Sequence, residues 1–483
     1  MSIFFLNNGI MNILQEYSVL NAKVIIYEEN GIGYYKVNEP NLDQNEIEIL
    51  NSILEYIYST PSVPNIEETV VKILKNKGIS DQGIIEKIIY YLRKRIGYDE
   101  LTVPLADPYV EEIECKGFSY PVTVVHRIVT RFPRLYTNII LEQEDHVLKV
   151  IEKLANKADK PVSIAKPYLE FSLPEGHRVA ATVSREVSLP GSTFDIRKFP
   201  LKPISPISLI KNESISSLML AYIWFLLDYK PFFLIIGSTG SGKTTLLNSI
   251  LSMINPFFKV ITIEDTPEIN IIHDNWIRFF ARQSISSQFE VSLMDLAKLS
   301  LRYRPDYLVI GEIRGKEIEA LVHASASGHG SLATFHAGNP HEALTRLLSL
   351  LNKDVAKLFL QNLWGIIVLG TLRDRNGNIR RIIRSIYEIV YTRGKLRFRP
   401  VLRWSFSSNT FMPNNIDDLI KRSYRISYIS KTYEIPISEI TKEISNRVKT
   451  LNNFVSNNIL DLEEFSVYLK KISQGDKVET KAI

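Results

Sequence analysis

The hydrophobic positions change their spacing along the chain, and each change predicts a different kind of element. From Ile47 to Arg95 apolar residues recur every three or four positions, with charged residues between them, which predicts amphipathic helices. From Leu101 to Phe199 the pattern changes to short β-like runs around one expected helix at Glu142–Lys157. We therefore expect a helical N-terminal extension over residues 1–98 and an α+β domain over residues 99–199.

A cluster of prolines marks the next boundary. Its members are Pro200, Pro203 and Pro206. Prolines at this density fix φ and remove helix hydrogen bonds, which predicts a stiff linker over residues 200–212. Beyond it, short apolar runs such as Phe232–Ile236 alternate with helical stretches. This alternation predicts an α/β domain, a parallel sheet covered on both faces, over residues 213–404. The pattern then weakens into a polar, partly helical tail over residues 405–483.

Composition limits the class of protein without naming its function. The chain has 483 residues, of which 45% are hydrophobic and 23% charged. These values are ordinary for a globular chain and exclude an extensively disordered protein. The net charge of +5 is too small for this length to indicate a nucleic-acid binder by itself.

Cysteine usage and the apolar runs predict a cytoplasmic protein. The single cysteine, Cys115, excludes an internal disulfide and a multi-cysteine zinc site. No basic region precedes the apolar residues of Met1–Tyr17, so no secretory signal is expected. The apolar runs Leu218–Leu227 and Phe232–Ile236 are shorter than the ~20 residues that a membrane span needs.

The segment from Gly237 to Thr244 matches the phosphate-loop pattern G-x-x-x-x-G-K-[ST]. A nucleotide phosphate needs several backbone N–H donors in a tight loop, and the helix that follows directs its N-terminal amides at the same anion. Lys243 would contact the β- and γ-phosphates, and the Thr244 hydroxyl would hold Mg²⁺. ATP and Mg²⁺ are the expected ligands. The predicted binding residues are Gly237, Ser238, Thr239, Gly240, Ser241, Gly242, Lys243, Thr244 and Thr245.

Other nucleotide signatures are absent or misplaced. Asn156–Asp159 has the letters of the guanine-specificity motif N-K-x-D. It precedes the phosphate loop, whereas in GTPases it follows, so we interpret it as a polar helix end. The chain also lacks an L-S-G-G-Q stretch, which argues against a transport-cassette ATPase.

Carboxylates follow two expected strands downstream of the loop. Glu264 and Asp265 end one apolar run, and Glu312 ends another. Because ligands bind at the carboxyl ends of parallel strands, these groups are expected to hold Mg²⁺ through water and to orient the attacking water. Gly311 stands where an aspartate usually caps the second strand. We therefore expect direct metal contact from Thr244 and water, with Glu312 polarising the nucleophile. The predicted metal-site residues are Thr244, Glu264 and Glu312.

Histidines and arginines complete the predicted site. His329 and His336 bracket a further short run, and either could sense the γ-phosphate; the spacing alone leaves a structural role equally open. Phosphoryl transfer also needs positive charge beyond one lysine, often an arginine finger. Four arginines lie between the two acidic clusters: Arg278, Arg282, Arg302 and Arg304.

Taken together, these motifs resemble the motor ATPases of type II and type IV secretion, type IV pili and the archaellum. The resemblance covers about Tyr120 to Glu388. It rests on Thr262–Asp265, which resembles the Asp box, on Ile310–Arg314, which resembles an atypical Walker B motif, on Gly328–His336, which resembles the His box, and on Leu301–Asp306, Leu173–Arg178 and Phe194–Lys198. Three features resemble the archaeal branch: the extended helical N-terminus, Gly315–Glu317 after Arg314, and the absence of a tetracysteine zinc insert.

The resemblance implies a homohexameric ring with RecA-like motor domains that works on an integral membrane platform protein. The protein would then lie at the inner face of the cell membrane, associated through its partners. Glu312 would be the catalytic carboxylate, with Glu264 supporting it and His336 beside the phosphate. Arg197 and Arg178 would reach the nucleotide from the N-terminal domain. Arg282 and Arg302 are the candidates for a neighbour's finger.

Two alternatives remain at this point. A nucleic-acid motor draws support from Arg373–Arg403, which carries ten Lys/Arg against two Asp/Glu. That segment also fits a solvated hairpin edge, or a platform or membrane contact, and no stable nucleic acid is expected. A catalytically dead regulator is disfavoured by intact Lys243, Thr244 and Glu312. The machine served is not specified by these motifs.

Overall fold

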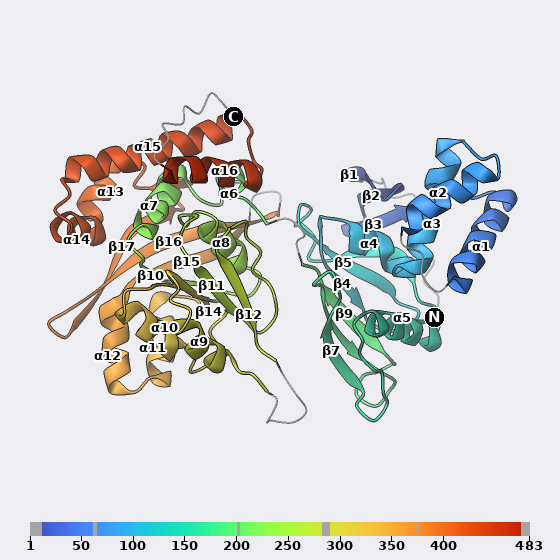
Figure 1. The fold of residues 1–483 in the computed structure, drawn as a ribbon, viewed down its shortest axis with the longest axis horizontal. Coiled ribbons are helices and arrows are strands. Elements are labelled where there is room, and N and C mark those ends of the chain that lie inside the picture. The colour runs from blue at the N-terminus through green and yellow to red at the C-terminus, as the bar shows by residue number, and fades with distance from the viewer. Residues whose placement is uncertain (1–11, 61–64, 200–202, 283–289, 374–376, 475–483) are drawn as a thin grey trace. The chain divides into compact units, whose positions relative to one another are not determined.

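The computed structural model describes residues 12–60, 65–199, 203–282, 290–373 and 377–474. The chain divides into two compact units. The first contains residues 1–201 with 375–378, and the second contains residues 202–374 with 379–483. Each unit has its own nine-stranded sheet (Figure 1). The described residues contain no helix that is both long and apolar enough to cross a membrane.

The sheet of the first unit has the order β1-β2-β3-β6-β5-β4-β9-β8-β7. Its strands are β1 (Asn12–Val19), β2 (Ala22–Glu29), β3 (Ile32–Asn38), β4 (Val110–Cys115), β5 (Pro121–His126), β6 (Leu135–Ile140), β7 (Tyr168–Ser172), β8 (Arg178–Thr182) and β9 (Thr193–Arg197). Residues 12–38 therefore form strands, not the helices expected there. In β2 the buried Ala22, Val24 and Ile26 alternate with more exposed neighbours, which is the period of a half-buried strand.

Helices pack against this sheet and beside it. They are α1 (Gln44–Ser59), α2 (Ile66–Asn76), α3 (Gln82–Ile96), α4 (Thr102–Ala106) and α5 (Glu144–Lys157), with the short 3₁₀ helix η1 (Asp99–Leu101). Helix α1 begins with a capping box, in which Asp43 and Glu46 each accept the other's backbone N–H. Helices α1 to α3 share a small apolar core, so the helical prediction from Ile47 to Arg95 agrees with the structure.

The sheet of the second unit has the order β12-β11-β13-β14-β10-β15-β16-β17-β18. Its strands are β10 (Phe232–Gly237), β11 (Val260–Glu264), β12 (Trp276–Phe280), β13 (Tyr307–Ile310), β14 (Gly330–His336), β15 (Leu363–Arg373), β16 (Ile379–Thr392), β17 (Lys395–Ser405) and β18 (Thr410–Met412). Strands β10 to β15 pair in parallel, whereas β15 to β18 pair antiparallel. The α/β fold class expected from the sequence is confirmed.

Helices cover both faces of the second sheet. They are α6 (Pro206–Lys211), α7 (Ser217–Leu227), α8 (Lys243–Leu251), α9 (Leu293–Leu301), α10 (Ile318–Ala326), α11 (Pro340–Leu350) and α12 (Lys353–Asn362). Strand β10 is buried on both sides: Phe233 and Ile235 belong to one apolar cluster, and Leu234 and Ile236 to the other. This double burial explains the continuous apolar run that marked the strand in the sequence.

The segment expected to be a polar tail is a packed helical layer over its described part. It contains α13 (Ile416–Arg422), α14 (Tyr424–Thr432), α15 (Ile437–Ser456) and α16 (Leu462–Ser473). Ile440, Leu451 and Phe465 are buried in the same cluster as α7. Each helix has polar residues on its outer face, and these separate the buried apolar positions in the sequence. The segment therefore looked polar on average.

Candidate nucleotide site

The phosphate loop connects the carboxyl end of β10 to the first turn of α8. Gly240 and Gly242 have φ values of +72° and +92°, a left-handed conformation that only glycine adopts without strain. At Gly237 a Cβ atom would lie 2.5 Å from the Ser241 hydroxyl. That hydroxyl is buried and has no hydrogen-bond partner within the described residues, so the loop holds a polar group available to a ligand.

Lys243 lies in the centre of the site. Its ammonium group is 3.2 Å from the Gly237 carbonyl, 3.1 Å from the Ser238 carbonyl and 3.3 Å from Nδ1 of His336. Burial and the charge of Lys243 lower the pKa of His336. A neutral imidazole that accepts from lysine at Nδ1 carries its proton on Nε2. That nitrogen lies 2.6 Å from Oε1 of Glu312, so His336 connects the phosphate loop to Glu312.

Arg314 holds the second oxygen of Glu312. Its Nε and Nη2 lie 2.9 and 2.8 Å from Oε2 of Glu312, and its Nη1 lies 3.3 Å from Asp265. Both carboxylate oxygens of Glu312 therefore have a cationic or polar partner. The sequence included Arg314 in the Walker B-like run but assigned it no role. Its position two residues after Glu312 was the available signal.

Glu264 is buried at the end of β11. Its Oε1 accepts hydrogen bonds from the backbone N–H groups of Glu268 and Ile269 at 2.8 and 2.7 Å. Its Oε2 is buried and has no partner among the described residues. Burial raises the pKa of Glu264 to about 7. A Cβ on Gly311 would lie 3.0 Å from Cγ of Glu264, so glycine at the end of β13 leaves space for this carboxyl.

Thr244 contacts a carboxylate that sequence reasoning missed. Its hydroxyl donates to Oε2 of Glu268 at 3.1 Å. Hydroxyl and carboxylate oxygens are the hard ligands that Mg²⁺ prefers, and this ion usually takes only one or two protein ligands besides phosphate and water. The residues present fit that ion. The described part of the chain has no group of three His, Cys, Asp or Glu side chains that could hold a metal ion by themselves.

Two predicted residues lie away from this edge of the sheet. His329 immediately precedes β14, whereas His336 ends it. The two histidines are therefore separated by the length of the strand, ~23 Å at the usual rise per residue. Nδ1 of His329 lies 3.0 Å from the Ala324 carbonyl. Within one chain His329 therefore does not approach the phosphate loop, and its contact with a nucleotide stays a prediction. Arg302, which follows α9 and precedes β13, lies at the same amino-terminal edge.

The other predicted arginines occupy different positions. Arg282 follows β12 and exchanges two backbone hydrogen bonds with Val291, both 2.9 Å long. Arg178 and Arg197 are opposite each other in the register of β8 and β9, in the first unit, and Arg178 also contacts Glu170 at 3.4 Å. Their roles at a nucleotide stay predictions.

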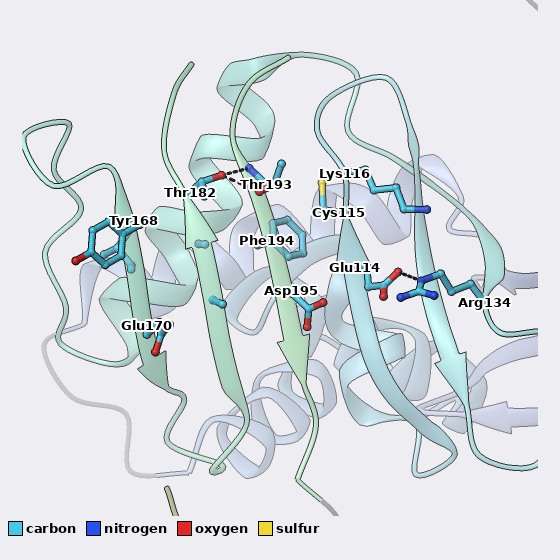
Figure 2. Close-up of a pocket in the computed structure, with 13 residues that line it drawn as sticks. Glu114, Cys115, Lys116, Arg134, Tyr168, Glu170, Thr182, Thr193, Phe194 and Asp195 are labelled. Atoms are coloured by element: carbon cyan, nitrogen blue, oxygen red, sulfur yellow. Dashed lines mark hydrogen bonds and ion pairs between the residues drawn. The ribbon is translucent and has the colours of Figure 1, made fainter. Parts of the chain in front are cut away.

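The first unit has a cavity of about 790 Å³ on its sheet. Figure 2 shows its wall, formed by β4, β7, β8 and β9. Arg134 pairs with Glu114 at 2.5 Å, and the Thr182 and Thr193 hydroxyls are 2.7 Å apart (Figure 2). Burial, followed by the charges of Glu112 and Glu114, raises the pKa of Asp195 to about 6. The lining of this cavity contains both cations and carboxylates. Its charge therefore does not indicate which class of ligand would bind there.

Comparison with known proteins identifies the family. The model of the type II/IV secretion system protein family matches residues 126–374, which include the phosphate loop and the residues around Lys243. The chain belongs to this family. An uncharacterized protein of Methanocaldococcus jannaschii is 32% identical to it over 473 residues, which cover 88% of this chain and 82% of that protein. The suspected relation to archaeal members is thereby confirmed.

Further similarities are more limited in extent. Protein VirB11 of Rhizobium radiobacter is 39% identical over 142 residues, which cover 29% of this chain and 41% of that protein. The X-ray structure of the Legionella pneumophila ATPase DotB aligns with 80% of this chain and 96% of its own, at 16% identity and a TM-score of 0.44.

Proposed function

We propose that this protein hydrolyses ATP and that the hydrolysis powers a type II/IV-type secretion or pilus assembly machine. The observation that carries the proposal is the connection from Lys243 through His336 to Glu312 at the carboxyl edge of the sheet. Family membership supports it.

In this proposal the loop binds the phosphates and Glu312 orients water. Backbone amides from Gly237 to Thr244 would donate to the phosphate oxygens. The Lys243 ammonium would exchange its contacts with the Gly237 and Ser238 carbonyls for contacts with phosphate oxygens. Glu312, held by His336 and Arg314, would accept the proton of the attacking water as it adds to the γ-phosphate and ADP leaves. Mg²⁺, held through Thr244 and Glu268, would neutralise phosphate charge.

The quaternary arrangement belongs to the same proposal. We infer a homohexamer, in which Arg282 or Arg302 of one subunit completes the site of its neighbour. Arg178 and Arg197 would contact the nucleotide from the N-terminal side. The partner would be an integral membrane platform protein, and the ATPase would lie at the cytoplasmic face of the membrane.

Two variants test the proposed chemistry. Lys243→Ala should abolish hydrolysis and weaken ATP binding, because it removes the charge that faces the phosphates. Glu312→Gln should keep ATP binding and lower kcat by about 100-fold or more, as expected when a group that orients or deprotonates the nucleophile is lost. Phosphate release and fluorescent-nucleotide binding measure the two quantities separately. Wild-type turnover in both variants would contradict the site.

A further inference from the structure

Strand β17 (Lys395–Ser405) has a row of cations on one face of the sheet. Lys395, Arg397 and Arg399 are exposed, whereas the alternating Leu396 and Phe398 are partly buried against the core below α11 and α12. Because side chains in a strand alternate between faces, the three cations share one face of the sheet. Figure 1 shows the β16–β17 hairpin as two long strands at the margin of the unit.

The outer edge of this strand is open beside the row. Strand β17 pairs with β16 on one side along Lys395–Arg403. On its other side β18 reaches only Arg403–Ser405. Among the described residues no strand therefore pairs with the outer edge of Lys395–Leu402, so its outward N–H and C=O groups remain available. Pro400, which lacks an N–H, and a bulge near it limit a regular edge to Lys395–Arg399.

Within the part of the chain that the structure describes, the cations of this row have no acidic side chain paired with them. In the described part of the chain, Lys395, Arg397 and Arg399 take part in no ion pair. Glu388 lies opposite Arg399, but its carboxylate already accepts hydrogen bonds from Tyr222, Ser423 and the Tyr424 backbone. The positive charge of the row is thus directed outward.

Protection of a strand edge against aggregation explains only part of this pattern. Charged residues, proline and bulges all block edge pairing, and Pro400 with its bulge already closes the second half of the edge. Three like charges on one face of a strand repel one another. Arg393, in the adjoining turn, adds further positive charge. Helix α13, which packs on β17, has Lys421 and Arg422 in its last turn but Asp417 and Asp418 in its first, so it adds no net charge. A repulsive row beside an open edge fits recognition of an anionic partner.

We propose that an extended acidic segment of a partner protein pairs with β17 at Lys395–Arg399 as an added strand. Its carboxylates would alternate with apolar residues. The carboxylates would lie beside Lys395, Arg397 and Arg399, and the apolar residues would extend the layer formed by Leu396 and Phe398. A nucleic acid or an anionic lipid surface would interact with the charge of the row. Neither would pair with the strand edge or match the two-residue alternation of cationic and apolar side chains.

Binding to the full-length protein tests this assignment. The probe is a fluorescein-labelled peptide that alternates glutamate and valine, and the matched control has the same composition with all glutamates first. We expect the alternating peptide to bind about tenfold more tightly than the block peptide. Arg397→Glu should reduce binding of the alternating peptide about tenfold, whereas Lys442→Glu on the exposed face of α15 should not. ATPase activity of both variants should equal that of the wild type, which shows that each is folded.

Several outcomes would overturn the proposal. Equal binding of the two peptides would show that binding depends on the charge of the peptide alone and not on strand pairing. Single-stranded DNA or phosphatidylglycerol vesicles that compete fully with the alternating peptide and lose affinity equally in Arg397→Glu would assign the row to another class of partner. Absence of peptide binding would assign the row to edge protection only.

Discussion

The two oxygens of Glu312 face different partners, and this asymmetry has chemical consequences. His336 contacts Oε1 and Arg314 contacts Oε2, so the carboxylate cannot rotate without losing one of them. A carboxylate that orients water benefits from such a fixed position, because misplacement of a reacting group lowers the rate steeply. His336 also contacts Lys243, so an approaching phosphate that displaces the lysine would change the environment of Glu312 directly.

The carboxyl of Glu264 predicts a stability that depends on pH. Its pKa is raised from 4.5 to about 7 by burial. A carboxyl with a higher pKa in the folded chain than in the unfolded chain stabilises folding fully below its unfolded pKa and loses this contribution as pH rises through about 7. Glu264→Gln should therefore gain stability relative to the wild type at high pH, by up to about 3 kcal/mol, and little at pH ~4.5. Thermal unfolding of both proteins across this range measures the difference; a difference independent of pH would contradict it.

Glu268 predicts a specific change in metal dependence. Its carboxylate accepts a hydrogen bond from the Thr244 hydroxyl, which would orient the hydroxyl oxygen towards a metal ion. Glu268→Ala should raise the Mg²⁺ concentration for half-maximal ATPase activity about tenfold, as loss of such supporting contacts usually does. Binding of ATP without Mg²⁺ should change little. A lower kcat with unaltered Mg²⁺ dependence would count against this role.

Single residues of the site differ in how well the sequence predicts them. The glycines and Lys243 follow from a local pattern, because the loop needs backbone conformations and a charge at fixed spacing. Glu268 and Arg314 act through side-chain contacts that depend on where the chain turns after β11 and β13, and no local period encodes that turn. His329 and His336 have the same residue type, and only the direction of β14 separates them.

At the scale of elements, a buried network attaches the last helices to the sheet. Glu388 on β16 is 1% exposed and accepts hydrogen bonds from Tyr222 on α7 and Ser423 at the start of α14. The Arg425 guanidinium, also buried, donates to the carbonyls of Leu363 and Ile389. These contacts connect β15, β16, α7 and α14. Helices α13 to α16 are therefore part of the second unit.

Loss of Glu388 should destabilise that unit strongly. Glu388→Ala would leave the hydroxyls of Tyr222 and Ser423 buried without their acceptor, and it would remove the carboxylate near Arg425. We expect a loss of about 3 kcal/mol or more, the size typical of a broken buried polar network. Glu439→Ala on an exposed position of α15 is the control and should be neutral. Urea unfolding followed by tryptophan fluorescence measures both, and equal midpoints would contradict the structural role.

Elements were predictable where burial leaves a clear apolar pattern in the sequence. Strands β10, β11 and β13 are buried on both faces, and their apolar runs marked them in the sequence. Residues 22–29 do have the two-residue period of a strand, but the helical spacing of Ile47–Arg95 was extended over them. Residues 405–474 were harder because their apolar positions are interrupted by tyrosines, asparagines and lysines. Their structure depends on packing against distant segments, such as α7 for the last helices, and a local pattern does not contain that information.

At the scale of the whole molecule, the response of the ATPase to nucleic acid distinguishes the two kinds of motor. A nucleic-acid motor would show ATPase activity stimulated by DNA or RNA, with stimulation that falls steeply as salt rises. An assembly motor should show neither. We expect no stimulation of the full-length protein by single- or double-stranded DNA at low salt. A reproducible, salt-sensitive increase in phosphate release would favour the nucleic-acid alternative.

The edge positions of the arginines make a prediction about neighbouring subunits. Arg302 lies at the amino edge of its own sheet, opposite the phosphate loop, so it can serve a nucleotide only from another subunit. Arg282 follows β12 and could act in trans as well. Arg282→Ala should keep ATP binding and lose most hydrolysis if it completes a neighbour's site. Mixed with Lys243→Ala subunits, it should regain activity at about a quarter of the sites, the fraction expected from random assembly of equal amounts in a ring. The control mixture pairs Lys243→Ala with the double variant and should stay inactive. If the first mixture also stays inactive while Arg302→Ala gives rescue in the same assay, the finger is Arg302.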